Sequence, residues 1–424
     1  MTEYLNETVF TWGGVPLKFG AGAVDEIGHD LAQQGAARVL IVTDPGLVAT
    51  GIPQRIADAA KVAGLTVEIY DGVHVEPTDT SLAAAVEFAR GSQWDGFIAV
   101  GGGSAIDTAK AVNLLTTYPG ELNDYLNKPI GEGKAPPGPL KPLVAVPTTA
   151  GTGAESTPVC VLDLLDLKVK TGISHPRLRP TLAVVDPLLT LTLPAAVTAA
   201  SGMDVLCHAL ESYTAKPYHA FARHTPETRV AYCGSNPISD VWAEQSMRLL
   251  GRSFRAAVLT GGNLEARTEM MLAATFAGMG FGNAGVHIPH ACGYPIAGMV
   301  RDYEPEGYPP GPLVPHGQSV SLTAPAAFRF TFPTDPARHL RAAELLAPDA
   351  PRQDDPRDQL PAVLASLMRD IGIPSGLAEV GYDKADVDGL VAGAMKQQRL
   401  LGVCPRPVTD QDLSSIFRTS MTNW

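Results

Sequence analysis

The stretch DGFIAVGGGSAIDTAK (95–110) passes from an apolar, strand-like run through three glycines into a helical pattern. Glycines let a backbone approach a ligand closely, and the N–H groups at the start of the following helix favour a phosphate group. The spacing differs from GxGxxG, so the usual dinucleotide fingerprint does not apply. A tight strand-to-helix turn without a ligand explains this motif, taken alone, equally well.

The same alternation of strand and helix patterns fills the first half of the chain. Runs typical of strands lie at 37–46, 64–72, 95–104, 141–153 and 181–187. Helical patterns separate the earlier runs, and the segment 157–174 has the pattern of an antiparallel pair. This order predicts a parallel, Rossmann-like sheet with helices on its faces.

Beyond Pro187 the strand patterns stop. Helical periodicity appears at 236–259, 263–281, 335–346 and 355–372. We therefore expect two domains, an α/β domain over residues 1–186 and an all-helical domain over residues 187–424. Two stretches rich in proline, glycine and tyrosine, 213–239 and 302–315, are expected to be loops of the helical domain.

Charge and hydrophobicity narrow the class of protein. The chain of 424 residues has a formal net charge of −12 and a pI near 5.3, which argues against nucleic acid or an anionic membrane as a partner. The segment 270–300 has no formal charge, but its glycines, prolines and histidines would be costly in a bilayer. We expect a buried helix pair there.

The cysteines and the N-terminus bear on location. Five cysteines are spread along the chain without a CxxC motif, which indicates a reducing compartment rather than a disulfide framework or a cysteine zinc site. The beginning, MTEYLNETVF, has neither the basic region nor the apolar region of a presequence. We therefore expect a cytoplasmic enzyme.

Two further stretches favour a dinucleotide near the glycines. PTTAGTGAE (147–155) follows a strand and supplies the hydroxyls of Thr148, Thr149 and Thr152 at a carboxyl end, where α/β sheets bind ligands. Asp44, in TDPG, could accept a hydrogen bond from a ribose 2′-OH and would repel a 2′-phosphate, which favours NAD over NADP. Its role could equally be to begin a proline turn.

A candidate metal site lies in the second half. In SGMDVLCHALESYTA (201–215), Asp204 and His208 are four residues apart, so both would face the same side of a helix. A simple Asp–His hydrogen bond would use the same spacing. His290 in GVHIPHACGYP and His316 in VPHGQSV could complete a site of one carboxylate and three imidazoles for Fe²⁺ or Zn²⁺.

Taken together, GGGSAIDTAK, PTTAGTGAE, GMDVLCHALE, HACGYP and PHG resemble the group III, iron-containing alcohol dehydrogenase family over nearly the whole chain. The family combines an NAD(P)-binding α/β domain with a helical metal domain, the dehydroquinate synthase-like architecture. The resemblance implies NAD, a divalent metal (Fe²⁺ first, Zn²⁺ as the alternative) and a homo-oligomer, dimer or larger.

The resemblance also assigns roles to individual residues. The implied metal ligands are Asp204, His208, His290 and His316. The expected dinucleotide-binding residues, with Asp44 added from the argument above, are Asp44, Gly101, Gly102, Gly103, Ser104, Asp107, Thr148, Thr149, Thr152 and Lys170. Lys170 matches a lysine near the nicotinamide ribose, and the expected catalytic residues are His287, Tyr294 and Lys170.

One branch of the family fits better than the others. SGMDVLCHALESYTA, AYCGSNPISD, GFGNAGVHIPHACGYPIAG and PLVPHGQSV resemble the hydroxyacid–oxoacid transhydrogenases. These oxidise 4-hydroxybutyrate to succinate semialdehyde and reduce 2-oxoglutarate to D-2-hydroxyglutarate, with NAD bound throughout. Many alcohol dehydrogenases of the family have a proton-relay histidine where this chain has Tyr294. A tyrosine relays protons poorly near neutral pH, and a transhydrogenase needs little net proton exchange.

Other interpretations stay open at this point. The chain could be an NAD-dependent alcohol dehydrogenase for small alcohols or hydroxyacids, or a dehydroquinate synthase-like lyase, although the GMD motif speaks against the lyase. His287 could be a packed helix histidine or a proton relay. Substrate carboxylates would need a cation, and the candidates are Arg177, Arg179, Arg229 and Arg301, each of which could equally be a solvated surface arginine.

Overall fold

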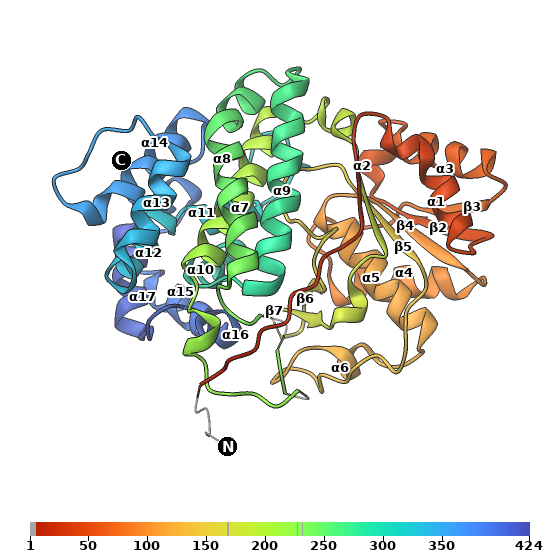
Figure 1. Cartoon of the computed structure of the whole chain (residues 1–424), viewed down its shortest axis with the longest axis horizontal. Coiled ribbons are helices and arrows are strands. Elements are labelled where there is room, and N and C mark those ends of the chain that lie inside the picture. The colour runs from red at the N-terminus through yellow and green to blue at the C-terminus, as the bar shows by residue number, and fades with distance from the viewer. Residues whose placement is uncertain (1–5, 168, 227, 231) are drawn as a thin grey trace. The chain divides into compact units, whose positions relative to one another are not determined.

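The computed structural model describes residues 6–167, 169–226, 228–230 and 232–424 (Figure 1). The chain forms two compact units, one of Gly13–Leu191 and one of Thr192–Trp424 together with the N-terminal segment up to Trp12. The predicted division after residue 186 falls inside the first unit, because Leu189, in the 3₁₀ turn Pro187–Thr190, is buried in the core of the sheet.

The first unit is built on a six-stranded sheet in which every pair of neighbouring strands is parallel. Its order is β1-β8-β5-β4-β2-β3. The strands are β1 Leu17–Phe19, β2 Arg38–Val42, β3 Thr66–Tyr70, β4 Gly96–Gly101, β5 Leu143–Pro147 and β8 Leu182–Val185. The predicted α/β class is confirmed. Only β1 was not predicted, since three residues are too few to show a period.

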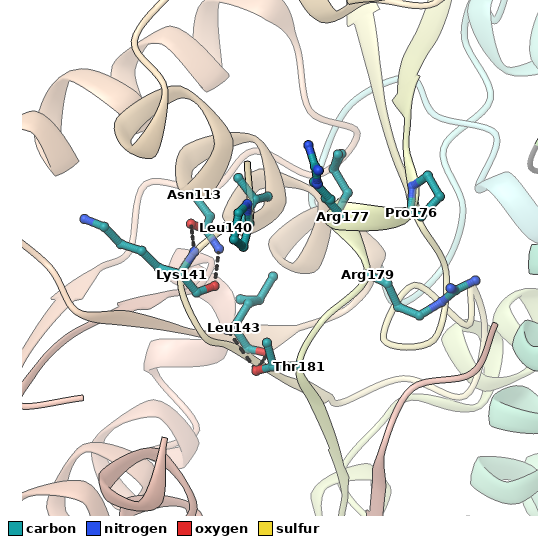
Figure 2. Close-up of a pocket in the computed structure, with 10 residues that line it drawn as sticks. Asn113, Leu140, Lys141, Leu143, Pro176, Arg177, Arg179 and Thr181 are labelled. Atoms are coloured by element: carbon teal, nitrogen blue, oxygen red, sulfur yellow. Dashed lines mark hydrogen bonds between the residues drawn. The ribbon is translucent and has the colours of Figure 1, made fainter. Parts of the chain in front are cut away.

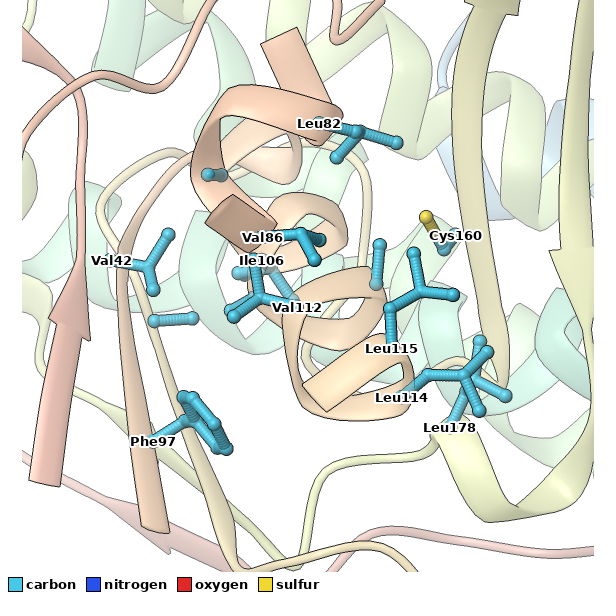
Figure 3. Close-up of a cluster of buried hydrophobic side chains, with 14 of the residues drawn as sticks. Val42, Leu82, Val86, Phe97, Ile106, Val112, Leu114, Leu115, Cys160 and Leu178 are labelled. Atoms are coloured by element: carbon cyan, nitrogen blue, oxygen red, sulfur yellow. The ribbon is translucent and has the colours of Figure 1, made fainter. Parts of the chain in front are cut away.

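Helices cover both faces of this sheet (Figure 1). Successive residues of β2 point to opposite faces, so Val39 and Ile41 join the core on one face and Leu40 and Val42 the core on the other. Figure 3 shows the second core, where Phe97 of β4 faces the helices. The helices of this unit are α1 Ile27–Gln33, α2 Pro45–Val48, α3 Ile52–Val62, α4 Asp79–Arg90, α5 Gly103–Thr117 and α6 Leu122–Tyr125.

The predicted antiparallel pair is the hairpin of β6 Val159–Leu164 and β7 Val169–Ser174. Lys110 of α5 forms hydrogen bonds to the segment that leads into this hairpin. Its side chain is fully buried, and Nζ donates to the carbonyls of Ala154 (2.8 Å) and Val159 (2.6 Å). The hairpin is therefore anchored to the helix that follows the glycine loop.

Among the described residues of the second unit, all regular secondary structure is helical, and its loops add only isolated bridges. Its helices are α7 Ala195–Thr214, α8 Pro237–Leu259, α9 Leu264–Ala284, α10 Ile288–Gly298, α11 His316–Ser321, α12 Ala324–Thr331, α13 Pro336–Leu346, α14 Gln359–Asp370, α15 Val387–Met395, α16 Gln398–Leu401 and α17 Asp410–Thr419. Long helices α7, α8 and α9 lie side by side (Figure 1).

The uncharged segment 270–300 forms α10 and most of α9, the predicted buried helix pair. Among the described residues, no helix has both the length and the apolar composition needed to cross a membrane. The predicted loop 302–315 contains no helix or strand. In the predicted loop 213–239, residues 227 and 231 lie outside the described part, and the rest contains the end of α7, the 3₁₀ turn Tyr218–Ala220 and the start of α8.

Candidate functional site

Helix α7 supplies a line of polar side chains to the interior of the second unit. Asp204, His208 and Glu211 follow one another at spacings of four and three residues, so they share one face of the helix. All three are buried, with exposed fractions of 2%, 4% and 0%. An isolated carboxylate in such a place is unfavourable unless a cation or hydrogen-bond donors compensate it. The face therefore needs partners from other helices.

Those partners are His290 of α10 and His316 of α11. The Nε2 atoms of His290, His208 and His316 lie 3.4, 3.6 and 3.7 Å from Oδ1 of Asp204. For a tetrahedral ion with ligand distances of about 2.1 Å, two ligand atoms are about 3.4 Å apart. The distances around Asp204 therefore have the spacing of a coordination shell.

Two atoms at the centre of this group favour a cation directly. Asp204 Oδ1 and His290 Nε2 are buried, and neither has a hydrogen-bond partner. Donor atoms of Asp204, His290 and His316 all lie within 4.8 Å of one another. His208 is held beside them by stacking of its ring on Phe281, with centroids 3.8 Å apart. The residues present therefore fit a divalent metal ion.

The protonation states of Asp204 and His208 suit the same interpretation. Burial alone would raise the pKa of Asp204, but the nearby imidazoles of His208, His316 and His290 hold it well below its usual range. Burial lowers the pKa of His208 to about 3. An anionic carboxylate and a neutral imidazole are the forms that bind a metal.

Glu211 is a functional residue that the sequence analysis missed. Its Oε1 lies 2.6 Å from Nδ1 of His290, and its Oε2 accepts from the backbone N–H of His287 at 2.6 Å. A carboxylate on Nδ1 keeps the proton there and leaves Nε2 to face Asp204. Burial alone would lower the pKa of His290, but Glu211 and Asp204 raise it to about 9, so a metal ion would displace the proton on Nε2 when it binds. The spacing of Asp204, His208 and Glu211 was the signal in the sequence.

A glycine explains how His316 comes so close to Asp204. A Cβ atom on Gly317 would lie 1.8 Å from the backbone oxygen of Ala200 and 3.1 Å from Cβ of Asp204. Only glycine therefore lets the start of α11 rest directly against α7. The PHG motif thus has a steric reason beside its histidine.

The two candidate relay residues are placed differently. His287 is fully buried, its Nε2 lies 3.1 Å from the hydroxyl of Thr214, and burial lowers its pKa to about 4. Thr214 donates its own proton to Leu210 O at 2.7 Å, so His287 Nε2 carries the proton in that contact. These contacts match those of a packed histidine. The ring of Tyr294 stacks near His316, with centroids 6.1 Å apart.

The predicted dinucleotide residues gather at the carboxyl edge of the sheet in the first unit. Asp44 follows β2, and Gly101 ends β4. The chain runs from β2 outward to β3 and returns to β4 on the other side of β2, so the strand order reverses between β2 and β4. Open α/β sheets bind ligands at such a switch point.

Close contacts at this edge depend on the absence of side chains. A Cβ on Gly103 would lie 2.6 Å from the side chain of Thr152, and one on Gly102 would lie 3.3 Å from Oγ1 of Thr149. Gly101 has a φ of 150°, and a Cβ there would approach Asp44 Oδ2 to 3.5 Å. Glycines, threonines and Asp44 are thus brought together around the start of α5, which has no side-chain cap.

Other predicted residues here have partners within the chain. Oδ2 of Asp107 accepts from the N–H of Val161 at 2.9 Å, and its Oδ1 lies 3.5 Å from Nζ of Lys110. The backbone N–H of Thr148 donates to Gly101 O at 3.1 Å. Of the two candidate functions of Asp44, the structure shows the turn, since its Oδ1 accepts from Leu47 N at 2.9 Å and begins α2.

The candidate arginines are dispersed. Arg177 and Arg179 line a cavity of about 200 Å³ at the amino ends of β5 and β8, whereas Gly101 lies at the carboxyl edge (Figure 2). In the other unit, Arg301 forms an ion pair with Asp386, and Nη2 of Arg229 lies 3.7 Å from Oε1 of Glu7.

Comparison with known proteins identifies the family. A model described as "Iron-containing alcohol dehydrogenase" matches residues 16–187, and one described as "Fe-containing alcohol dehydrogenase family, C-terminal" matches residues 198–421. The chain belongs to the iron-containing alcohol dehydrogenase family. The predicted recognition is therefore confirmed.

Within the iron-containing alcohol dehydrogenases, the predicted branch is also confirmed. A bovine protein (Bos taurus) named "Hydroxyacid-oxoacid transhydrogenase, mitochondrial" is 48% identical over 411 residues, which is 96% of this chain and 88% of that protein. The human protein of the same name is 47% identical over the same shares of the two chains.

Solved structures of the family have the same fold. The crystal structure of a 1,3-propanediol oxidoreductase has a TM-score of 0.85 and 32% identity, and the match covers 97% of this chain and 100% of that one. Sulfoacetaldehyde reductase from Bifidobacterium kashiwanohense, in complex with NAD⁺, has a TM-score of 0.81 and 28% identity, with 98% and 99% covered.

The predicted cytoplasmic location is wrong. The bovine and human relatives are both named mitochondrial. The prediction rested on the dispersed cysteines and on the residues MTEYLNETVF, and the names of the relatives overturn it.

Replacing Glu211 should weaken metal binding without emptying the ligand shell. In Glu211→Gln the side chain keeps its size but loses the charge that holds Nδ1–H of His290. We expect about 10- to 100-fold weaker binding of Fe²⁺ or Zn²⁺, measured by competition with a chelator. Unchanged metal affinity would show that Glu211 serves only to accept hydrogen bonds from backbone N–H groups at the start of α10.

Gly317→Ala should also lose metal, but through displacement of α11. The methyl group meets the Ala200 carbonyl, so His316 must move away from Asp204. We expect substoichiometric metal in purified protein, measured by elemental analysis. Gly298→Ala, where a Cβ meets nothing within 4 Å, is the matched control and should retain full metal content.

Proposed function

We propose that this chain is a hydroxyacid–oxoacid transhydrogenase that oxidises 4-hydroxybutyrate to succinate semialdehyde and reduces 2-oxoglutarate to D-2-hydroxyglutarate. The observation that carries this proposal is 48% identity, over 96% of the chain, to a protein of that name. The cluster of one carboxylate and three imidazoles supports it, because it offers the chemistry that the reaction needs.

Asp204, His208, His290 and His316 would hold a divalent metal ion, which we propose to be Fe²⁺ from the family name, with Zn²⁺ suited by the same ligands. When bound, such an ion acts as a Lewis acid on an alcohol or carbonyl oxygen. Asp204 supplies the anionic ligand, and Glu211 fixes the tautomer of His290. Asp204, His208 and His290 are buried, and His316 is partly exposed.

NAD is the proposed hydride carrier, held at the carboxyl edge by the glycine loop 101–103, Ser104 and the threonines Thr148, Thr149 and Thr152. Asp44 favours NAD over NADP, since its carboxylate would repel a 2′-phosphate. Lys170 is proposed to lie near the nicotinamide ribose. One NAD that is reduced by the hydroxyacid and reoxidised by the oxoacid balances both half-reactions.

The substrates are small carboxylates, and we propose a homo-oligomer, as the family resemblance implies. A second candidate is an ordinary NAD-dependent alcohol dehydrogenase for small alcohols or hydroxyacids. It is favoured by the 1,3-propanediol oxidoreductase that matches the whole fold at 32% identity.

The two candidates differ in whether free nucleotide is needed. Purified protein without added NAD, given 4-hydroxybutyrate and 2-oxoglutarate, should form succinate semialdehyde and 2-hydroxyglutarate in equal amounts, measured by chromatography. Asp204→Asn should abolish both products, because it removes the anionic metal ligand. No product without NAD⁺, but steady NADH from a short-chain alcohol when NAD⁺ is supplied, would select the alcohol dehydrogenase.

Tyr294→His tests the proposed link between proton retention and transhydrogenation. An imidazole titrates near neutral pH and can exchange a proton with solvent, whereas a phenol with a pKa near 10 does so poorly. We expect net NADH production from 4-hydroxybutyrate and NAD⁺ to rise by about tenfold or more in the variant. Unaltered NADH production would contradict the link, but it would not bear on the proposed transhydrogenase function.

A further inference from the structure

Glu76, in the loop after β3, has an unusual backbone conformation. Among the described residues it is the only one other than glycine with a positive φ, 57°. Residues with a side chain adopt this left-handed region rarely, and such outliers persist where surrounding contacts hold them. The contacts of Glu76 therefore identify what this conformation is for.

Both ends of Glu76 are engaged. Its backbone N–H donates to Oγ of Ser104, in the first turn of α5 beside the glycine loop, at 3.1 Å. Its side-chain Oε2 forms an ion pair with Nζ of Lys170, on β7. The next residue, Pro77, accepts a hydrogen bond from Asp163 N on β6 at 2.8 Å. One residue thus joins the glycine loop to the β6–β7 hairpin.

Lys170 is the group that this link holds. It faces Asp163 across the antiparallel ladder, and Nζ donates to Asp163 Oδ2 at 3.0 Å as well as to Glu76. Its side chain is only 8% exposed. Burial alone would lower the pKa of Lys170, but Glu76 and Asp163 raise it above the ordinary value, so the ammonium keeps all three hydrogens. The described contacts use two of them.

We propose that Glu76 is a positioning residue for the bound dinucleotide, which fixes the Lys170 ammonium relative to the glycine loop so that the third N–H can donate to an oxygen of the nucleotide. This inference rests on the proposed binding of NAD to the carboxyl edge. Asp163 could hold the lysine on the hairpin by itself. Of the two carboxylates that hold Lys170, the one whose residue also contacts Ser104 is Glu76. This second contact accounts for the unfavourable backbone conformation of Glu76.

Two substitutions separate this role from a merely structural one. Glu76→Gly removes the carboxylate, but glycine adopts a φ of 57° without strain, so the unfolding temperature should stay the same or rise. Glu76→Gln keeps the length and removes the charge. After bound nucleotide has been removed, we expect both variants to bind NADH about tenfold more weakly than the unaltered protein in a fluorescence titration, the scale of one lost charge-assisted hydrogen bond.

A double-variant cycle tests whether Glu76 acts through Lys170. Lys170→Met should weaken NADH binding to a similar extent, and adding Glu76→Gln should cause little further loss. Glu132→Gln is the matched control, because Glu132 pairs with Lys134 at 2.7 Å on the surface of the same unit and should leave NADH affinity unchanged.

The outcomes are distinguishable. A lowered unfolding temperature with unchanged NADH affinity in the Glu76 variants would overturn the positioning role and leave the proposed function intact. Independent, additive losses in the cycle would overturn the route through Lys170. Failure of the unaltered protein to bind NADH after its own nucleotide has been removed would overturn the proposed NAD binding, and the positioning role with it.

Discussion

The polar interior of the second unit is built around one buried carboxylate, which must be compensated by its neighbours. Asp204 is 2% exposed, and its Oδ1 has no hydrogen-bond donor of its own, yet three imidazole nitrogens surround it at 3.4 to 3.7 Å. Such a cluster is poorly stable without a cation at its centre. Four potential ligand atoms must meet at one point. The close packing of α11 on α7 at Gly317 and the buried carboxylate of Glu211 both serve this arrangement.

Local periodicity predicted much of the fold. Five of the six strands of the sheet, the hairpin and the long helices leave their own period in the sequence, because their burial pattern repeats every two or every 3.6 residues. The exact division between the units was not accessible, since Leu189 joins the sheet core through contacts distant in sequence. Strand β1 is held by its pairing with β8 rather than by its own pattern.

The sequence predicted those site residues that belong to a local motif. It did not predict those whose role depends on contacts between segments distant in sequence. Asp204 and His208 share a helix face by spacing alone, whereas Glu211 meets His290 only after α7 and α10 pack. Glu76 has no motif of its own, and its importance lies in a backbone angle and in two partners from separate segments. The proposed metal ligands are thus easier to predict than the residues that orient them.

The proposed double use of Asp44 limits how the cofactor preference of this enzyme could be redesigned. The carboxylate that we propose to disfavour a 2′-phosphate also accepts from Leu47 N and begins α2. Replacing it by alanine to admit NADP would remove that cap, at about 1 kcal/mol. Serine or asparagine would retain a capping oxygen without the negative charge. Cofactor engineering at this position is therefore coupled to stability, and the two can be separated only by a residue that is polar but neutral.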